Sequence, residues 1–315
     1  MKREASPAQT LQRVNTMASL PEWTGSWTVK RAQLIATVRA FFIERGYLEV
    51  DTPLLRPYAS PDLHVVAPRL AGPKPRFLCA SPEMEMKRLL AVVRRPIFQI
   101  TKSFREGEEG QWHAPEFTLV EWYHLDSDSA RLRQETRALV LRLAEEAASL
   151  GLSPPSALCH HTAWAEHSFE ETWNAAGLPQ LSTLHDSEVD AHWAFDVQPH
   201  LGKPRPLFVT PWPSRLAGLA RCSAPGTADR FEAFFAGLEL CNGFAENTDA
   251  ALQRERWLAA FGSSAPSVMD ESYLAALAEL PPCAGNALGL DRVFALLAGA
   301  PSLSAVLPFA PPADR

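Results

Sequence analysis

The chain has 315 residues, enough to bury a large core in one big domain or two modest ones. Its 46 % hydrophobic and 21 % charged residues are typical of a globular protein, and a net charge of −6 argues against broad nucleic-acid binding. Five cysteines lie far apart without a C-x-x-C pair, which favours reduced thiols over a disulfide framework or a zinc site. With no signal-peptide core and no apolar run of membrane-spanning length, these features predict a cytoplasmic protein.

The first 55 residues predict an arm, a helix and a short strand. Residues 1–27 lack periodicity and read as an N-terminal arm, with Trp23 and Trp27 at its end. Ser26 or Thr28 is expected to cap a helix whose apolar residues recur at helical spacing up to Gly46. The segment G-Y-L-E-V-D-T-P-L-L then reads as a strand that Pro53 interrupts.

A second strand and helix are predicted around residue 80. F-L-C-A-S (residues 77–81) has a strand pattern, and S-P-E-M-E-M-K-R-L-L begins a helix. Ser81 is expected as the N-cap, with Pro82 at the first helical position and Glu83 in the first turn. A carboxylate there is equally explained by the helix dipole or by contact with a ligand amine.

The stretch from Ser103 to Tyr123 reads as strand, charged loop and strand. Side chains alternate along the second strand, so Phe117, Leu119, Glu121 and Tyr123 share one face. An aromatic ring, a carboxylate and a phenol would then face one site, with Arg105 held across the loop. Arg105 has the geometry to bind a phosphate, and Phe117 offers a flat surface for a base.

The following region predicts one long helix and then less regular structure. Residues 126–150 carry Leu132, Leu139 and Leu143 at helical spacing, and Gly151 ends the pattern. Residues 152–228 are rich in Pro, His and Trp with weak periodicity, which predicts an insertion holding a few helices. Neither G-x-x-x-x-G-K-[ST] nor G-x-G-x-x-G occurs, so a nucleotide would bind without a glycine-rich phosphate loop.

The C-terminal part holds a strand pair and a final small-residue motif. Alternating apolar residues flank Gly237 in the segment 230–246, which predicts a bend there that brings Glu232 and Glu239 together. Paired carboxylates suit Mg²⁺ held jointly with nucleotide phosphates. By period two, Asn242, Phe244 and Glu246 face the same side. A-G-N-A-L-G-L-D-R then places small residues before a helix that begins near Asp291.

Four of these segments resemble a known family, in the correct order. F-R-E-G-E-E-G-Q-W-H-A-P-E-F-T-L-V-E-W-Y is similar to motif 2 of class II aminoacyl-tRNA synthetases, above all the lysyl enzymes and their paralogues that modify elongation factor P. E-L-C-N-G-F-A-E resembles their E-x-x-N-G-F-x-E, and G-L-D-R resembles motif 3. The segment ending at Pro53 is similar to motif 1, the dimer element, so the resemblance implies a homodimer. It covers about residues 28 to 310 and implies an α+β fold, an antiparallel sheet flanked by helices.

The resemblance also implies the roles of individual residues. Arg105 and Arg292 would be catalytic, and Glu232 and Glu239 would hold Mg²⁺. The ATP-binding residues would be Arg105, Glu106, Gly107, Glu108, His113, Ala114, Phe117, Glu239, Leu240, Asn242, Gly289 and Arg292. The amino-acid substrate would contact Ser81, Pro82, Glu83, Glu121, Tyr123, Asn242, Phe244, Glu246 and Ala287.

Three positions depart from the pattern of the lysyl enzymes. Gly107 stands where the family has a glutamate that reads adenine, and Glu106 or Glu108 would have to replace it. Ala114 stands in place of an asparagine. Ala287 replaces a glycine of the lysyl-tRNA synthetases, and the elongation factor P ligases carry alanine there.

The predicted function is ATP-dependent activation of a diamino acid. Glu83, Glu121 and Glu246 would be costly to bury together unless cations meet them, and lysine or β-lysine brings two ammonium groups. The resemblance implies elongation factor P as the acceptor. Only about 27 residues precede the first expected helix, too few for an anticodon-binding domain, so tRNA is not the expected acceptor. Three alternatives stay open: a synthetase that still charges tRNA, an inactive binding or regulatory paralogue, and amide synthesis on a small molecule.

Overall fold

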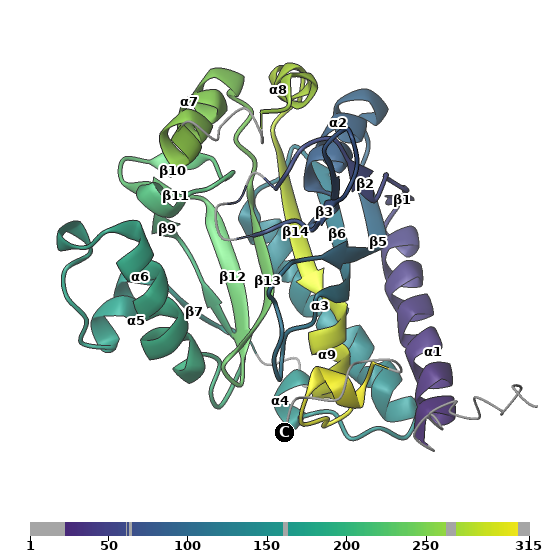
Figure 1. Ribbon diagram of the computed structural model, residues 1–315. Coiled ribbons are helices and arrows are strands. Elements are labelled where there is room, and N and C mark those ends of the chain that lie inside the picture. The colour runs from purple at the N-terminus through teal and green to yellow at the C-terminus, as the bar shows by residue number, and fades with distance from the viewer. Residues whose placement is uncertain (1–22, 61, 63–64, 160–162, 263–268, 308–315) are drawn as a thin grey trace, which may run out of the picture.

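The chain folds around one eight-stranded sheet in the computed structural model, which describes residues 23–60, 62, 65–159, 163–262 and 269–307 (Figure 1). The strand order is β1-β5-β6-β14-β13-β12-β8-β7. The strands are β1 (Leu48–Glu49), β5 (Ile97–Phe104), β6 (Glu116–Leu125), β14 (Cys283–Gly289), β13 (Leu238–Ala245), β12 (Arg230–Phe235), β8 (Leu207–Val209) and β7 (Ala165–His167). The pairings β1–β5 and β7–β8 at the two edges are parallel, and those between them are antiparallel. The predicted α+β fold with an antiparallel sheet is therefore confirmed.

Helices cover the sheet unequally. The long helices α1 (Trp23–Glu44) and α3 (Ser129–Ser149) pack with α9 (Leu290–Leu297) into the largest apolar cluster. In Figure 1, α3 lies behind the sheet, α1 runs along its right-hand side and α9 lies below β14. That cluster takes Val120 and Trp122 from β6. A smaller cluster on the other side joins α2 (Glu83–Val93), α7 (Ala250–Phe261) and α8 (Glu271–Ala278) around Tyr123. The alternation along β6 thus sends Trp122 into the main core and Tyr123 to the opposite face.

The helix boundaries differ from the predicted ones at three places. Helix α1 begins at Trp23, so the expectation that Ser26 or Thr28 caps it is wrong. Trp27 is only 5 % exposed and its indole donates to the Val306 carbonyl at 2.5 Å, which ties the first turns of α1 to the residues after α9. Helix α3 begins at Ser129, where the Asp128 carboxylate accepts from the Arg131 amide. The N-cap of α2 is Pro82 rather than Ser81.

The insertion at residues 152–228 consists of short elements, and it also extends the sheet by β7 and β8. Its helical segments are α4 (Ser156–Cys159), α5 (Phe169–Ala175), η2 (Leu181–Thr183), α6 (Asp186–His192), η3 (Trp193–Val197), η4 (Gln198–His200) and η5 (Ser214–Leu216). An aromatic cluster holds them to the sheet, with Phe169 stacked on Trp193 at 4.5 Å between ring centroids. The alternation of apolar and polar side chains does not reveal β7 and β8 in the sequence, because each strand has only three residues.

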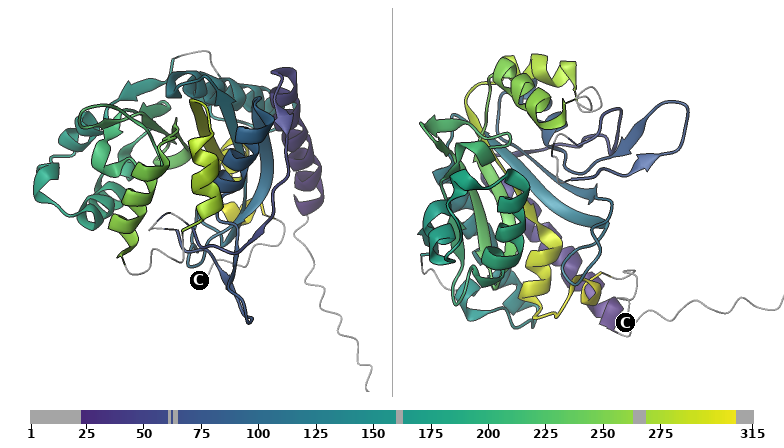
Figure 2. Two further views of the ribbon diagram at one scale, coloured as in Figure 1. Left: turned by 90° about the horizontal axis from the view of Figure 1, so that it is seen from above. Right: turned by 60° about the vertical axis from the view of Figure 1, so that its left-hand side comes forward.

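Two small sheets complete the fold. The first has the order β10-β11-β9, with β10 (Cys222–Ala224), β11 (Thr227–Ala228) and β9 (Trp212–Pro213). The second, β2-β4-β3, comprises β2 (Leu55–Arg56), β4 (Arg76–Leu78) and β3 (Arg69–Leu70), and its β3–β4 end projects from the body in both views of Figure 2. A further turn of helix, η7 (Leu303–Ala305), follows α9. Among the described residues, none of the helices is long and apolar enough to cross a membrane.

Candidate functional site

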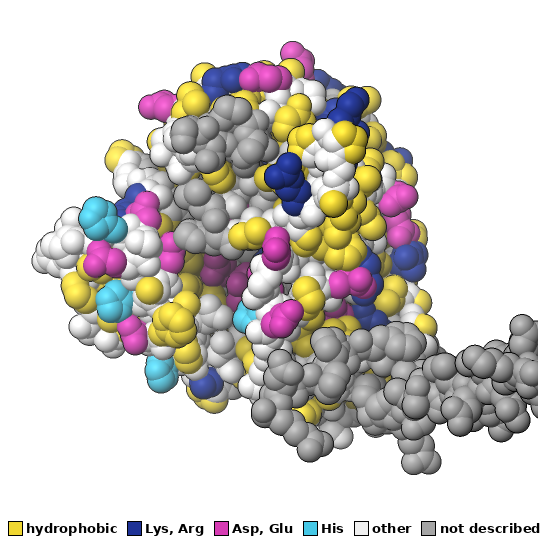
Figure 3. Space-filling model, viewed as in Figure 1, with side chains coloured by type: hydrophobic (Ala, Val, Ile, Leu, Met, Phe, Trp, Pro, Cys, Tyr) yellow, Lys and Arg dark blue, Asp and Glu magenta, His cyan; other side chains and the backbone are white. Residues whose placement is uncertain are grey.

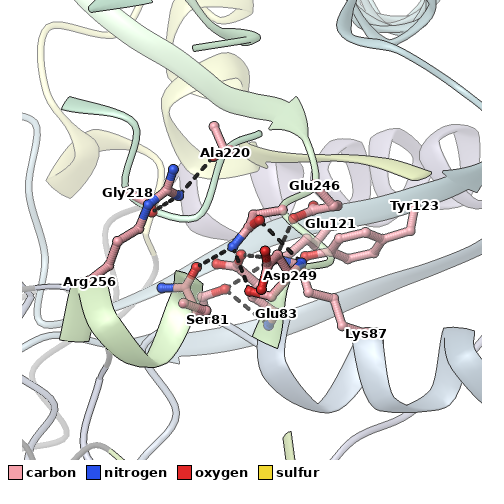
Figure 4. A network of polar contacts seen from close by, with 12 residues as sticks. Ser81, Glu83, Lys87, Glu121, Tyr123, Gly218, Ala220, Glu246, Asp249 and Arg256 are labelled. Atoms are coloured by element: carbon pink, nitrogen blue, oxygen red, sulfur yellow. Dashed lines mark hydrogen bonds and ion pairs between the residues drawn. The ribbon is translucent and has the colours of Figure 1, made fainter. Parts of the chain in front are cut away.

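Three carboxylates from separate elements meet on the sheet face that α2 borders. Glu83 begins α2, Glu121 lies in β6 and Glu246 follows β13 directly (Figure 4). We call these three residues the carboxylate cluster. Figure 3 shows acidic side chains within a hollow at the centre of the same face. The sequence resemblance assigned these three residues to one site, and in the fold they lie close together.

The cluster already contains a cation, the side chain of Lys87. Its ammonium lies 2.5 Å from Glu83 Oε1 and forms a second ion pair with Glu246 Oε2. Lys87 is 2 % exposed, and the ring of Phe244 lies 5.2 Å from its nitrogen. Burial opposes the charge, but the two carboxylates outweigh it and raise the pKa of Lys87. The ammonium therefore stays charged.

Glu121 is held by two hydroxyl groups instead of a cation. Ser81 Oγ donates to Glu121 Oε2 at 2.9 Å, and the Tyr123 hydroxyl donates to Glu121 Oε1. Ser81 Oγ also accepts from the Glu83 amide at 3.2 Å. Ser81 thus connects the N-terminus of α2 to the middle of β6.

Burial makes two carboxylates of the cluster, Glu121 and Glu246, more basic. Desolvation, reinforced by the Glu83 charge, raises the pKa of Glu121 to about 7. Desolvation raises the pKa of Glu246 to about 8, although the Lys87 ammonium opposes this shift. With all three carboxylates ionised, one ammonium leaves two negative charges without a partner. The arrangement is therefore suited to a ligand that carries two positive charges.

The floor of the site is formed by small residues of β14. Ala287 lies directly between Glu121 on β6 and Asn242 on β13 in the strand register. Asn242 Oδ1 is buried and has no hydrogen-bond partner among the described residues. Gly285 has no room for a side chain, because an added Cβ would lie 2.2 Å from the Tyr123 ring and 2.7 Å from Glu246 Oε1. The backbone here must approach the site closely.

The two arginines lie where motif 2 and motif 3 meet the sheet. The Arg105 guanidinium lies 5.1 Å from the Phe117 ring centroid, and its Nε is buried without a hydrogen-bond partner among the described residues. Arg292 donates to the carbonyls of Trp112 and Glu239, each at 3.1 Å, and so joins the motif 2 loop to β13.

The loop between β5 and β6 explains why a glycine stands at position 107, where the lysyl enzymes have a glutamate. Gly107 has a φ of 78°, a value that favours glycine over other residues, so the turn itself explains this residue. Glu108 Oε1 lies 3.2 Å from Arg105 Nη1, whereas Glu106 is exposed. Of the two acidic residues left open above, Glu108 is the one turned towards Arg105. Desolvation and the nearby Arg292 charge lower the pKa of His113, which keeps an exposed edge.

The bend at Gly237 joins Glu232 and Glu239 as predicted. The strands β12 and β13 connect through Ala236 and Gly237, both with positive φ, and a register shift places Glu239 opposite Phe234. Since Phe234 and Glu232 share one face, Glu239 lies on the Glu232 side. Burial, with the Glu239 charge adding to it, raises the pKa of Glu232 to about 8, although Arg230 donates to it at 2.5 Å.

The structure does not bring all predicted residues to the site in the same way. Leu240 is 2 % exposed and packs into the main core, so its side chain lies on the far face of β13. Pro82 is buried in the turn before α2, and Gly289 directly precedes α9. Ala114 packs partly against the main core. Lys87 was missed by the sequence reasoning, although its position four residues after Glu83 on a helix is the signal that finds it.

Comparison with known proteins identifies the family of this chain. The sequence matches the family described as tRNA synthetases class II (D, K and N) over residues 22–312. It is 39 % identical to "Elongation factor P--(R)-beta-lysine ligase" of Edwardsiella ictaluri, over 93 % of this chain and 98 % of that protein. Proteins of the same name from Sodalis glossinidius and Salmonella typhi are each 37 % identical, over 90 % and 93 % of this chain and 94 % and 98 % of theirs. The chain therefore belongs to the class II tRNA synthetase family of the D, K and N type.

Proposed function

We propose that this protein is an ATP-dependent ligase that activates (R)-β-lysine or lysine as an adenylate and transfers it to a lysine side chain of elongation factor P. The observation that carries the proposal is the buried carboxylate cluster with its single resident ammonium, Lys87. A diammonium substrate balances the two remaining negative charges, whereas a neutral or acidic amino acid leaves them unpaired. The names of the relatives support the same substrate and acceptor.

The residues present fit ATP and Mg²⁺. Arg105 beside Phe117 provides a guanidinium for phosphate and a ring for the base, and Arg292 provides a second guanidinium. Burial keeps Glu232 basic, the half-buried Glu239 adds a second negative charge beside it, and a divalent cation would relieve this charge. Among the described residues no three metal-ligating side chains cluster, so phosphate oxygens would complete the coordination. When bound, Mg²⁺ would supply charge neutralisation at the phosphates.

The chain's own groups would act by positioning and charge. The substrate carboxylate attacks the α-phosphorus of ATP, and the bond to pyrophosphate breaks. The carboxylate cluster holds the two ammonium groups so that the carboxylate points to ATP, while Arg105 and Arg292 stabilise charge on the phosphates. An acceptor amine then attacks the carbonyl, AMP leaves, and the amine loses its proton. No nucleophile from the protein is required.

Exchange of labelled pyrophosphate into ATP tests the activation step. The protein should support exchange with at least one lysine isomer in the presence of Mg²⁺. Exchange with no isomer, in protein that a thermal unfolding scan shows to be folded, would favour the inactive paralogue. For the acceptor, labelled substrate should appear on elongation factor P, and labelling of tRNA instead would overturn that part.

Ala287 is expected to influence which lysine isomer is used. Its methyl group lies between Glu121 and Asn242 in the strand register, where glycine would leave space beside the α-carbon of the substrate. Ala287→Gly should raise kcat/KM for α-lysine relative to β-lysine by about 10- to 200-fold, the range for one methyl group in a packed site. The measurement compares both isomers in both proteins. An unchanged ratio would make Ala287 a packing residue only.

The affinity for a diammonium ligand should increase as the pH rises from 6 to 8.5. Glu121 and Glu246, with pKa values of about 7 and about 8, hold protons at pH 6 and must release them to pair with ammonium groups. Titration calorimetry in two buffers of different ionisation enthalpy should detect proton release near pH 7. The ligand-free protein should lose stability over the same range, because the folded state binds more protons than the unfolded chain. A pH-independent affinity would contradict this assignment of the carboxyls.

A further inference from the structure

A buried arginine outside the motifs lies behind the carboxylate cluster. Arg56 ends the short strand β2, beyond the Pro53 segment, and is only 5 % exposed. Arginine is seldom buried to this degree unless its charge and its donors find partners. The nature of those partners therefore tells what the residue does.

Among the residues that the structure describes, the hydrogen-bond and ion-pair partners of Arg56 lie in residues 79–85, which lead from β4 into α2. Its Nε lies 2.9 Å from Glu85 Oε1. Its Nη1 donates to the Ser81 carbonyl at 3.0 Å, and its Nη2 lies 3.0 Å from Met84 Sδ. A planar guanidinium holds these three partners at once, which the single ammonium of a lysine does not reproduce.

The turn that Arg56 holds carries two groups of the site. Ser81 donates to Glu121, and the backbone amide of Glu83 donates to Ser81. Pro82, the N-cap of α2, offers no side-chain hydrogen bond to the helix, so the local restraint at the helix start is the bond from the Glu83 amide to Ser81. The contact of Arg56 with the Ser81 carbonyl holds the same residue from a neighbouring sheet.

We propose that Arg56 is a positioning residue: by holding the Ser81 carbonyl and the first turn of α2, it fixes the Ser81 hydroxyl and Glu83 for the binding of the diammonium substrate. It does not touch the substrate itself. The inference rests on the proposed function for its kinetic consequence, but its structural consequence is measurable without any substrate.

Glu85 serves as the counter-ion that makes this burial tolerable. Burial raises the pKa of Glu85, and Arg56 is the main charge that opposes the shift, followed by Arg88, with Asp270 acting in the other direction. Removing Arg56 alone would leave Glu85 buried without its partner, and that variant would risk unfolding. A test needs the pair removed together.

The test variant is Arg56→Met with Glu85→Met. Replacing both members of a buried ion pair by apolar residues is often neutral for stability, while the hold on the Ser81 carbonyl is lost. The matched control is Arg39→Met with Glu49→Met, an exposed pair at 2.8 Å between α1 and β1. Arg56→Lys serves as a third variant, which keeps the positive charge opposite Glu85 but loses the planar guanidinium with its several donors.

Two readouts separate positioning from stability. Amide hydrogen exchange should accelerate in residues 79–90 of the test variant, while its unfolding midpoint stays near that of the control. The KM for the diamino acid in pyrophosphate exchange should rise by up to about 100-fold, the cost of a small misplacement in a site, with the KM for ATP unchanged. Arg56→Lys should show the same rise in KM.

The outcomes distinguish this inference from the proposed function. Unchanged exchange in residues 79–90, or an unchanged KM for the diamino acid in the test variant, would overturn the role of Arg56. If the unaltered protein activates no lysine isomer, the proposed function fails, and local exchange alone then decides whether Arg56 holds the turn. Equal rises in both KM values would indicate a general structural defect and also overturn the inference.

Discussion

Replacing Glu246 by glutamine is expected to weaken binding of the diamino acid by about 2–5 kcal/mol, the cost of truncating one partner of a buried charge pair. Glu246 is 2 % exposed, and its Oε1 has no hydrogen-bond partner among the described residues, so a ligand ammonium can take that position. The ligand-free protein should tolerate the change near neutral pH. Because the pKa of Glu246 is about 8, its carboxyl already holds a proton near neutral pH and resembles the amide of glutamine.

Titration calorimetry with lysine and β-lysine measures this effect, and a nucleotide titration measures ATP binding, which should stay the same. Glu121→Gln should behave similarly, because Glu121 belongs to the same cluster. Glu116→Gln is the matched control: Glu116 begins the same strand, but its side chain is 54 % exposed and pairs with Lys102 at the surface. Unchanged diamino-acid affinity in both cluster variants would remove these carboxylates from the binding site.

Lys87→Met should destabilise the protein by about 3–5 kcal/mol at pH 8.5, because it leaves buried carboxylates without their cation. Lys87 is fully buried between Glu83 and Glu246, so no water replaces its ammonium easily. The loss should shrink at pH 6. Without Lys87 the pKa of Glu246 rises further, and protonation then removes the uncompensated charge.

Urea unfolding at pH 8.5 and at pH 6, analysed with the same denaturant slope for each variant, gives the loss of unfolding free energy at each pH. The matched control is Lys102→Met, whose ammonium pairs with Glu116 at 3.1 Å on the surface and should contribute at most about 1 kcal/mol. Adding Glu246→Gln to Lys87→Met should recover part of the loss at pH 8.5. Equal losses in the two lysine variants, or the same loss at both pH values, would show that Lys87 is not the counter-ion described above.

Much of the site could be predicted from the sequence because it follows from local periodicity. Alternation along a strand places Glu121 beside Tyr123 and Asn242 beside Glu246, whatever the strand packs against. The bend at Gly237 is similarly local, since two consecutive residues with positive φ form the connection. The antiparallel fold followed from three motifs in the correct order, and the match to the family over residues 22–312 agrees with it.

Other features depended on contacts between residues distant in the chain. The first turns of α1 are held by Trp27, which donates to the carbonyl of Val306 279 positions away. The direction of the Leu240 side chain, into the main core and away from the site, follows from the register shift between β12 and β13, which a period of two does not contain. The short strands β7 and β8 exist because they pair with β12, not because of their own pattern.

By itself, the sequence determined which residue types face the site: three carboxylates, two arginines and a floor of small residues. The net charge that these side chains present together was decided only by the tertiary structure. In the sequence alone Lys87 and Arg56 do not stand out, since a lysine on a helix and an arginine before a proline are usually solvated. Burial turns the first into the cluster's own counter-ion and the second into the support of the turn at Ser81. The free-energy cost of burying a charge, and its need for charged partners, depend on how much solvent the group loses. For Lys87 and Arg56 that loss is set by the packing of α2 against the sheet.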